Sequence, residues 1–342
     1  EETTSRAAWS MASILDLSET DGTQAVLKAL GADVDQRRER IFLLLTLIYE
    51  APQVELVRDS FRSGDPDGRV YALELLDALL DANTRELIFP LLEDLTLNQR
   101  LKRLEPRCPQ RRLKPVDRLK NVVLAEYSAI GPWGRVCALE ALANLLDGRI
   151  CDEQIAQLYH PNPMLREAAA LGMQRADPVA STQALELLPE PMRDETFHIL
   201  QAAGEGALSI AGKIAALKAA PLLARVDEGS LVDLALLCRE VRLSPGASLL
   251  QVGERVQFVY LLVDGTVTIG EQARVDEAGS LLGEMVWGSS GEATLAIVAA
   301  SPARLLCLGR DVMTGFLVEH PEAAANLKQA VDGTLLELKE CT

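Results

Sequence analysis

The chain has 342 residues, which is too long for one ordinary domain and predicts at least two. Its 50 acidic and 34 basic residues leave a net charge of −16, which argues against nucleic-acid binding because phosphate contacts need excess Lys and Arg. Hydrophobic residues make up 48% and aromatic residues only 4%, so we expect a folded protein with an aliphatic core.

The six cysteines stand far apart without CxxC spacing, and there are only three histidines. This pattern argues against a zinc site and a disulfide scaffold, and predicts small core cysteines of a reducing compartment. The longest apolar run, Ile41 to Tyr49, is too short to span a bilayer. No GxxxxGK[ST], GxSxG or HExxH motif occurs, so we do not expect an enzyme. Because the chain begins at Glu1, we expect a piece of a longer protein.

Residues 1 to about 225 carry apolar residues at three- and four-residue spacing, which predicts one helix after another. Several prolines fall where a first helical turn begins, and their missing N–H costs nothing there. We place a helical repeat domain at residues 1–208 and a second domain at residues 209–342.

The helical part contains an internal repeat. Residues 66–81 read PDGRVYALELLDALLD, residues 132–147 read PWGRVCALEALANLLD, and residues 163–172 read PMLREAAALG. Each copy has Pro, then Arg three residues later, then Ala three residues later. The third copy resembles the HEAT repeat in its bacterial form. Such a period predicts stacked helix pairs that bury their faces against their neighbours.

Two fainter copies are expected near Val34 and near residue 99. The Arg of each clear copy is expected to be structural, capping a helix or bridging to the adjacent unit, because solvated or bridging charges are the usual case. These residues are Arg69, Arg135 and Arg166.

Residues 100–120 hold nine basic residues against two acidic ones, a local net charge of +7. Three prolines keep the middle from forming a regular helix, so we expect a long loop. The run is either simply solvated, or a surface for anionic lipid headgroups or an acidic face of another chain. The candidate residues for that surface are Arg100, Lys102, Arg103, Arg107, Arg111, Arg112 and Lys114.

From Val241 the pattern changes to short β-branched runs separated by glycines, and a helical period returns over residues 308–338. Asp264-Gly265 between two apolar runs predicts a hairpin. The sequence therefore predicts an α+β protein, in which an α-helical solenoid precedes a small antiparallel β-barrel with flanking helices. The predicted strands are residues 258–263, 266–269 and 295–298.

Residues 213–338 resemble the cyclic-nucleotide-binding domain, which occurs in bacterial catabolite activators, kinase regulatory subunits and gated channels. The resemblance implies a jelly-roll barrel, a helical lead-in, a closing lid helix and a regulatory function. It rests on the order and spacing of Pro245-Gly246, Gly253-Glu254, Gly265-x-Val267-x-Ile269, Gly279 and Gly283-Glu284.

The family's ligand cassette runs Gly-Glu, seven residues, then Pro-Arg-Ala-Ala, with Glu on the ribose and Arg on the cyclic phosphate. Here Gly283-Glu284 is followed by seven residues from Met285, then Glu292, Ala293 and Thr294. Ala293 stands at the Arg position, and Glu292 adds a negative charge. A lost Arg–phosphate pair of about 1.5–3 kcal/mol predicts binding weaker by roughly two orders of magnitude. We expect no cofactor, and binding of a cyclic nucleotide stays open.

Three residues near the cassette have two interpretations each. Glu284 either contacts a ribose or caps a helix that begins at Met285. Trp287 either covers a base or fills the pocket from within. Leu335 lies in the last predicted helix, which either closes over the base or simply packs on the barrel.

The phrase RVYALELLDALLD…LIFPLLEDL…RLKRL also resembles the soluble C-terminal part of bacterial ATP/ADP translocase-type transporters. That resemblance implies an attached transmembrane domain and a place in the cytoplasm, at the inner face of the membrane. We therefore expect a non-enzymatic regulatory or scaffolding module with a degenerate cyclic-nucleotide-binding domain and a protein partner. The alternative is a working cyclic-nucleotide sensor with a non-standard phosphate contact, for example through Arg304 or Arg274.

Overall fold

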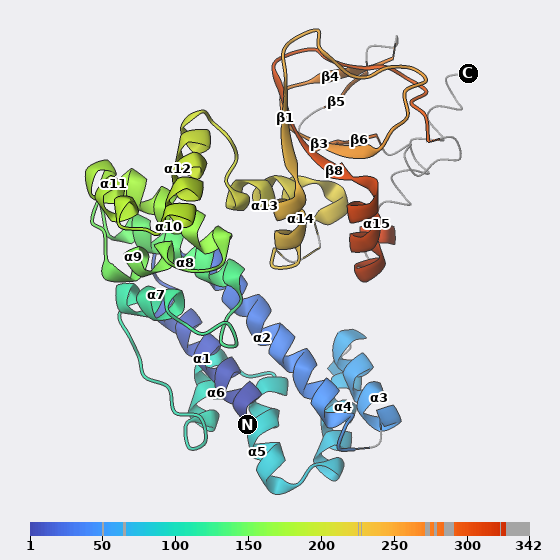
Figure 1. Cartoon of the computed structure of the whole chain (residues 1–342). Helices are drawn as coiled ribbons and strands as arrows, with labels where there is room; N and C mark the ends of the chain where they lie inside the picture. The colour runs from blue at the N-terminus through green and yellow to red at the C-terminus, as the bar shows by residue number, and fades with distance from the viewer. Residues whose placement is uncertain are drawn as a thin grey trace. The chain divides into compact units, whose positions relative to one another are not determined.

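The computed structural model describes residues 1–49, 51–63, 66–224, 226, 228–270, 274–276, 279–283, 291–321 and 323–325. The chain divides into two compact units, Glu1–Leu188 and Pro189–Thr342, called unit 1 and unit 2 below (Figure 1). The domain boundary expected after residue 208 stays a prediction. Within the described ranges, no helix is both long enough and apolar enough to cross a membrane.

The regular secondary structure described in unit 1 is α-helical, as the apolar spacing predicted, with loops between the helices. Its helices are α1 (Glu2–Leu17), α2 (Gln24–Leu45), α3 (Ala51–Ser63), α4 (Pro66–Leu79), α5 (Ala82–Leu92), α6 (Leu97–Leu104), α7 (Pro115–Val123), α8 (Pro132–Leu145), α9 (Asp152–Leu158), α10 (Pro163–Ala176) and α11 (Pro178–Glu186).

Local capping explains where several of these helices begin. Asp81 accepts a hydrogen bond from the backbone N–H of Thr84 at the start of α5. Thr96 and Gln99 form a reciprocal capping box at the start of α6. Helices α7, α8, α10 and α11 begin with proline, whose fixed φ suits a first turn.

The core of unit 1 is aliphatic, as composition predicted. Helix α1 packs along α2 (Figure 1), and both contribute to one buried cluster with α4 and α5. Met11, Leu76 and Leu92 are fully buried in this cluster. Cys108 and Cys137 are buried free thiols.

The arginine of each clear repeat copy donates to backbone carbonyl oxygens of a neighbouring segment. Arg69 donates to Leu92 O at the end of α5, and Arg135 donates to Val123 O at the end of α7. Arg166 donates to the carbonyl oxygens of His160 and Pro161. The bonds of Arg69 and Arg135 satisfy carbonyl groups that a helix end leaves unpaired, which is the predicted capping role. The bonds of Arg166 hold the connection between α9 and α10. Whether the helices form a HEAT-like solenoid stays a prediction.

One of the two faint repeat copies coincides with a helix start. Helix α2 runs unbroken from Gln24 to Leu45, so no helix begins at Val34. Near residue 99, helix α6 begins at Leu97, and Arg100 donates to the carbonyl oxygens of Glu93 and Leu95. Whether these segments are copies of the repeat stays a prediction.

Unit 2 combines helices with short strands. The helices are α12 (Glu190–Gly204), α13 (Ile210–Ala219), the 3-10 helix η1 (Pro221–Leu223), α14 (Leu231–Leu237) and α15 (Arg310–Glu319). The strands are β1 (Arg239–Leu243), β2 (Ser248–Leu250), β3 (Phe258–Asp264), β4 (Val267–Ile269), β5 (Arg274–Asp276), β6 (Leu281–Leu282), β7 (Ile297–Ala299) and β8 (Ala303–Gly309).

The strands form two four-stranded antiparallel sheets, in the orders β1-β8-β3-β6 and β2-β7-β4-β5 (Figure 1). This is the strand order of a double-sheet jelly roll. One apolar cluster draws residues from both sheets, including Leu262 and Leu305 from the first and Val267 and Ile297 from the second. The chain is therefore an α+β protein, and closure of the sheets into a barrel stays a prediction.

The predicted hairpin at Asp264-Gly265 is wrong. Strand β3 pairs with β6 and β8, whereas β4 pairs with β5 and β7, so this turn carries the chain from one sheet to the other. Gly265 has φ +86°, and a Cβ there would lie 2.2 Å from the carbonyl oxygen of Pro302. An Asp-Gly pair between two apolar runs is compatible both with a hairpin and with a tight turn that carries the chain from one sheet to the other.

Candidate functional site

The cassette begins directly after β6. Gly283 has φ +81°, and a Cβ at this position would lie 2.9 Å from the carbonyl oxygen of Phe258. Close approach to β3 and the left-handed backbone both require glycine here. Glu284, Met285, Trp287 and Leu335 lie outside the described residues.

The second part of the cassette, residues 291–294, runs antiparallel to residues 253–256. The N–H of Ala293 donates to Glu254 O at 2.8 Å, and the N–H of Gly253 donates to Ala293 O at 2.8 Å. The N–H of Val256 donates to Gly291 O at 2.9 Å. These three bonds fix the backbone around Ala293, the position that the sequence resemblance predicts to match the family's phosphate-binding arginine.

Ala293 is 2% exposed and belongs to the apolar cluster of unit 2. Its buried partners in that cluster include Leu250, Val256 and Ile297. The side chain therefore faces the interior between the sheets. A longer side chain at this position would project into the same interior.

Glu292 and Thr294 are exposed, in contrast to Ala293 between them. Successive side chains of an extended segment point to opposite faces. Glu292 is opposite Arg255 in an isolated antiparallel bridge, so the two side chains share the outer face. The charge of Glu292 thus lies on the outer face. Its effect on a phosphate, like the effect of the missing arginine at position 293, stays a prediction.

Arg304 was one candidate for a substitute phosphate contact. It lies on β8 between Ala303 and Leu305, which both face the apolar cluster, so its own side chain points to the opposite face. Its Nε lies 3.6 Å from Glu240 Oε1. Arg304 is therefore committed to the outer face of the first sheet. The side chain of Arg274, the other candidate, lies outside the described residues.

Glu240 is the centre of that outer-face cluster. Its carboxylate accepts hydrogen bonds from the N–H of Leu208 at 2.8 Å and from Arg242 Nε at 2.8 Å. Burial alone would raise the pKa of Glu240, but these hydrogen bonds and the charges of Arg242 and Arg304 lower it. The cluster joins the lead-in segment to β1 and is structural.

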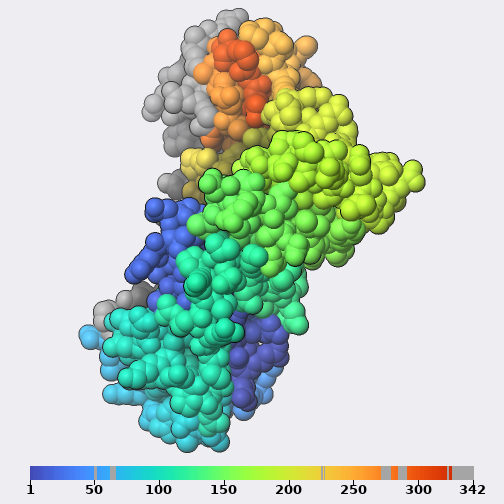
Figure 2. All heavy atoms as spheres, turned by 90° about the vertical axis from the view of Figure 1, so that its left-hand side faces the viewer, coloured from blue at the N-terminus to red at the C-terminus, as the bar shows by residue number. Residues whose placement is uncertain are grey.

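The basic stretch in unit 1 is only partly a loop. Residues 100–104 belong to α6, residues 115–120 belong to α7, and residues 105–114 between them are not helical. In Figure 2 the teal spheres of this part of the chain form part of the surface turned to the viewer.

Four of the seven candidate basic side chains have hydrogen-bond or ion-pair partners within unit 1. Arg100 donates to the carbonyl oxygens of Glu93 and Leu95, and burial, with help from nearby Arg38 and Arg69, lowers its pKa. The side chains of three others form ion pairs, namely Arg103 with Glu93, Arg107 with Glu86 and Arg112 with Asp16. These contacts neutralise much of the local charge.

Lys102, Arg111 and Lys114 are exposed. No ion pair or side-chain hydrogen bond involves these three side chains within the described part of unit 1. A surface for an anionic partner would therefore depend on these three residues rather than on all seven.

Comparison with protein-family models finds no match for this chain. Comparison with curated protein sequences finds none either.

Among solved structures, the chain is similar to the N-terminal domain of a transcriptional regulator from Streptomyces coelicolor, with 26% identity over 36% of this chain and 95% of that one, at a TM-score of 0.30. It is similar to the catabolite activator protein of Thermus thermophilus, with 26% identity over 35% of this chain and 60% of that one, at a TM-score of 0.31. A cyclic nucleotide-binding-like protein from Brucella abortus matches with 23% identity over 31% of this chain and 97% of that one, at a TM-score of 0.27.

Proposed function

We propose that this chain is a non-catalytic regulatory module. Unit 2 is a domain of the cyclic-nucleotide-binding type with a degenerate phosphate site, and unit 1 is a scaffold that binds a protein partner. The observation that carries the proposal is the buried alanine at position 293, which packs in an apolar cluster where the family pattern places an arginine.

The missing cation matters because a buried phosphate needs compensation. Burying an ionised group without a partner is very costly, and hydrogen bonds to charged groups contribute about 1.5–3 kcal/mol each. The described buried side chains of the cluster that contains Ala293 are all aliphatic, and none of them is a cation. Arg304, the described alternative, is bound to Glu240 on the other face. Both points favour a domain that regulates through packing or partner contacts rather than by sensing a cyclic phosphate.

The type of domain is supported by sequence and topology together. The glycine pattern resembles that of the family over residues 213–338. Gly265 and Gly283 have positive φ, and a Cβ on them would meet the carbonyl oxygens of Pro302, just before β8, and of Phe258 in β3. The strand order is that of a jelly roll, with helices before β1 and after β8.

Attachment to a transmembrane domain, at the cytoplasmic face of a membrane, is the finer part of the proposal. Its support is the resemblance to transporter tails, together with the three exposed cations Lys102, Arg111 and Lys114. An anionic membrane surface attracts such a cluster by about 1 kcal/mol for each basic residue near it.

Thermal unfolding of the full chain with cyclic AMP or cyclic GMP tests the proposal. A ligand that binds the folded state with micromolar Kd stabilises it by about 4 kcal/mol at roughly 1 mM, which predicts a rise in Tm of roughly 8–16 °C. We expect no rise beyond that produced by AMP, which controls for unspecific effects of an adenine nucleotide. A rise of that size with a cyclic nucleotide would show a working sensor and overturn the degenerate site.

A further inference from the structure

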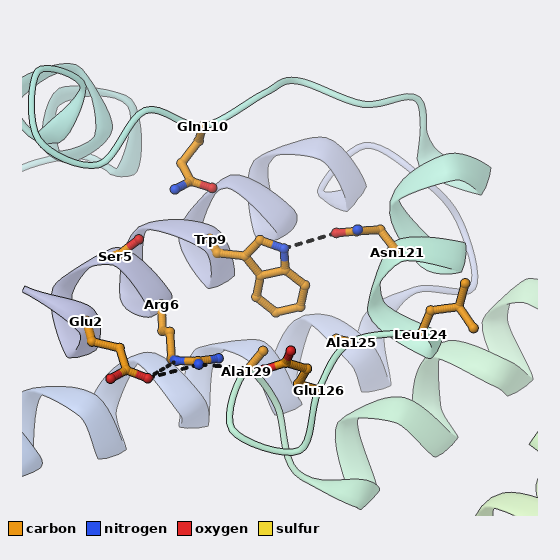
Figure 3. A pocket seen from close by; sticks show the side chains of 10 residues that line it. All are labelled: Glu2, Ser5, Arg6, Trp9, Gln110, Asn121, Leu124, Ala125, Glu126 and Ala129. Carbon is orange, nitrogen blue, oxygen red and sulfur yellow. Dashed lines mark hydrogen bonds and ion pairs between the residues drawn. The ribbon is translucent and has the colours of Figure 1, made fainter. Parts of the chain in front are cut away.

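Unit 1, which the proposed function makes the scaffold for a protein partner, contains a surface cavity of about 530 Å³, and the inference below rests on that function (Figure 3). Its wall comes from the N-terminal half of α1, from the connection between α6 and α7, and from residues 121–129. The volume falls in the range of about 300–1,000 Å³ that is typical of ligand sites.

Trp9 stands in the middle of this cavity (Figure 3). Its indole Nε1–H donates to Asn121 Oδ1 at 3.0 Å, so the ring edge is anchored to α7. Asn121 also accepts from Arg118, which holds the amide in place. No cation lies over the Trp9 ring in the described part of the chain, where the one recorded cation–π pair is Arg69 over Phe61. Trp9 is half-buried, and its exposed part lines the cavity.

The charged groups that line the cavity are unequal in number. Arg6 lies between Glu2, at 2.9 Å, and Glu126, at 3.8 Å (Figure 3). The side chains of the two glutamates are 78% and 82% exposed. One guanidinium against two carboxylates leaves one negative charge uncompensated at the rim.

We propose that this cavity binds a basic side chain, Arg or Lys, presented by a polypeptide partner. The cationic head lies over the indole face of Trp9, since Trp is the aromatic side chain that attracts cations most strongly. Glu126 lies next to it and belongs, with Glu2 and Arg6, to a charged group whose sum is negative. Leu124 and Ala129 on the wall contact the aliphatic stem, as long basic side chains require. An anion is disfavoured because Arg6 is already paired with both carboxylates.

The test is a titration of the full chain with the peptide acetyl-Gly-Arg-Gly-amide, followed by NMR of the indole N–H groups. The chain has three Trp residues, and the Trp9 signal is the one that disappears in Trp9→Phe. The same peptide with citrulline in place of Arg has almost the same shape without the charge. We expect a saturable shift of the Trp9 signal with the Arg peptide in the millimolar range or tighter, and at least roughly tenfold weaker binding of the citrulline peptide.

Two variants that each remove one negative charge test whether the Arg peptide binds at the cavity. Glu126→Gln removes the rim carboxylate and is expected to weaken the Arg peptide at least about threefold. Glu19→Gln makes the same change at an exposed site beyond the other end of α1, and is expected to leave the Kd unchanged. Equal binding of the two peptides, equal effects of the two variants, or no saturable shift up to about 10 mM would each overturn the proposal.

Discussion

Asp16 of α1 and Arg118 of α7 form a buried ion pair inside unit 1. Arg118 Nη2 lies 2.6 Å from Asp16 Oδ2, and the exposed fractions of the two side chains are 3% for Arg118 and 1% for Asp16. Asp16 also accepts the N–H of Leu113 at 3.0 Å and pairs with Arg112. One carboxylate thus ties the first helix to the end of the basic stretch, almost a hundred residues further along the chain.

Asp16→Ala should destabilise unit 1 by about 3–5 kcal/mol, because it leaves the buried guanidinium of Arg118 without its carboxylate. Chemical denaturation followed by circular dichroism measures the change. Asp77→Ala is the matched control, since its pair with Arg85 is exposed and should contribute less than about 1 kcal/mol. Equal losses in the two variants would contradict a structural role for the buried pair.

His160 should make the stability of unit 1 depend on pH. Burial and the positive charges of Arg135 and Arg166 lower its pKa, and its Nδ1 accepts the N–H of Asn162 at 3.0 Å. The unfolded chain therefore binds the proton more readily than the folded chain does. The stabilisation is complete above the unfolded pKa of about 6.5 and is lost as the pH falls below it.

The measurement is the Tm of the wild type and of His160→Gln between pH 5 and pH 8. The wild type should lose more stability on acidification than His160→Gln, by less than about 1 kcal/mol because the ring is partly exposed. His198→Gln, at an exposed histidine, should follow the wild type. Identical pH profiles for the wild type and His160→Gln would show that His160 does not cause the pH dependence of stability.

Gly265→Ala should destabilise unit 2 by more than about 1–3 kcal/mol, because a strained φ and a clash with the Pro302 carbonyl oxygen act together. Gly246→Ala provides the comparison, since Gly246 has a similar φ of +81° but no atom within 4 Å of the added Cβ. It should cost only the backbone strain, about 1 kcal/mol. The measurement is thermal unfolding of both variants. A smaller loss of stability in Gly265→Ala than in Gly246→Ala would contradict the close packing of Gly265 where the chain crosses between the sheets.

Charge reversal at the three exposed cations tests the membrane surface. The triple variant Lys102→Glu, Arg111→Glu, Lys114→Glu should lose co-sedimentation with vesicles that contain phosphatidylserine, while its Tm stays near that of the wild type. The control reverses Lys28, Arg40 and Arg149, which are exposed elsewhere on unit 1. Equal vesicle binding by the two triple variants would show that Lys102, Arg111 and Lys114 do not form a membrane-binding surface.

Local patterns predicted much of the fold. The Pro-x-x-Arg pattern placed the starts of α8 and α10 correctly and gave the capping role of Arg135. Helix α7 also begins with a proline that is followed three residues later by an arginine, but Asn121 stands where the pattern has alanine.

Partners that are distant along the chain could not be predicted. The charge run gave no sign that Asp16 would neutralise Arg112 and Arg118. Asp264-Gly265 specified a turn, but strand pairing across two sheets decided that the turn is no hairpin. At the candidate site, alignment located Ala293, whereas the opposite orientations of Glu292 and Ala293 follow from pairing with residues 253–256.

The most direct test of the degenerate site is isothermal titration of the wild type, Ala293→Arg and Ala299→Arg with cyclic AMP. Ala299 is a second alanine that is 2% exposed in the same cluster, so both variants bury an added cation. We expect no binding tighter than about 100 μM for the wild type and Ala299→Arg, and affinity higher by about tenfold to a hundredfold for Ala293→Arg. Micromolar binding by the wild type, or no gain in a folded Ala293→Arg variant, would contradict the account.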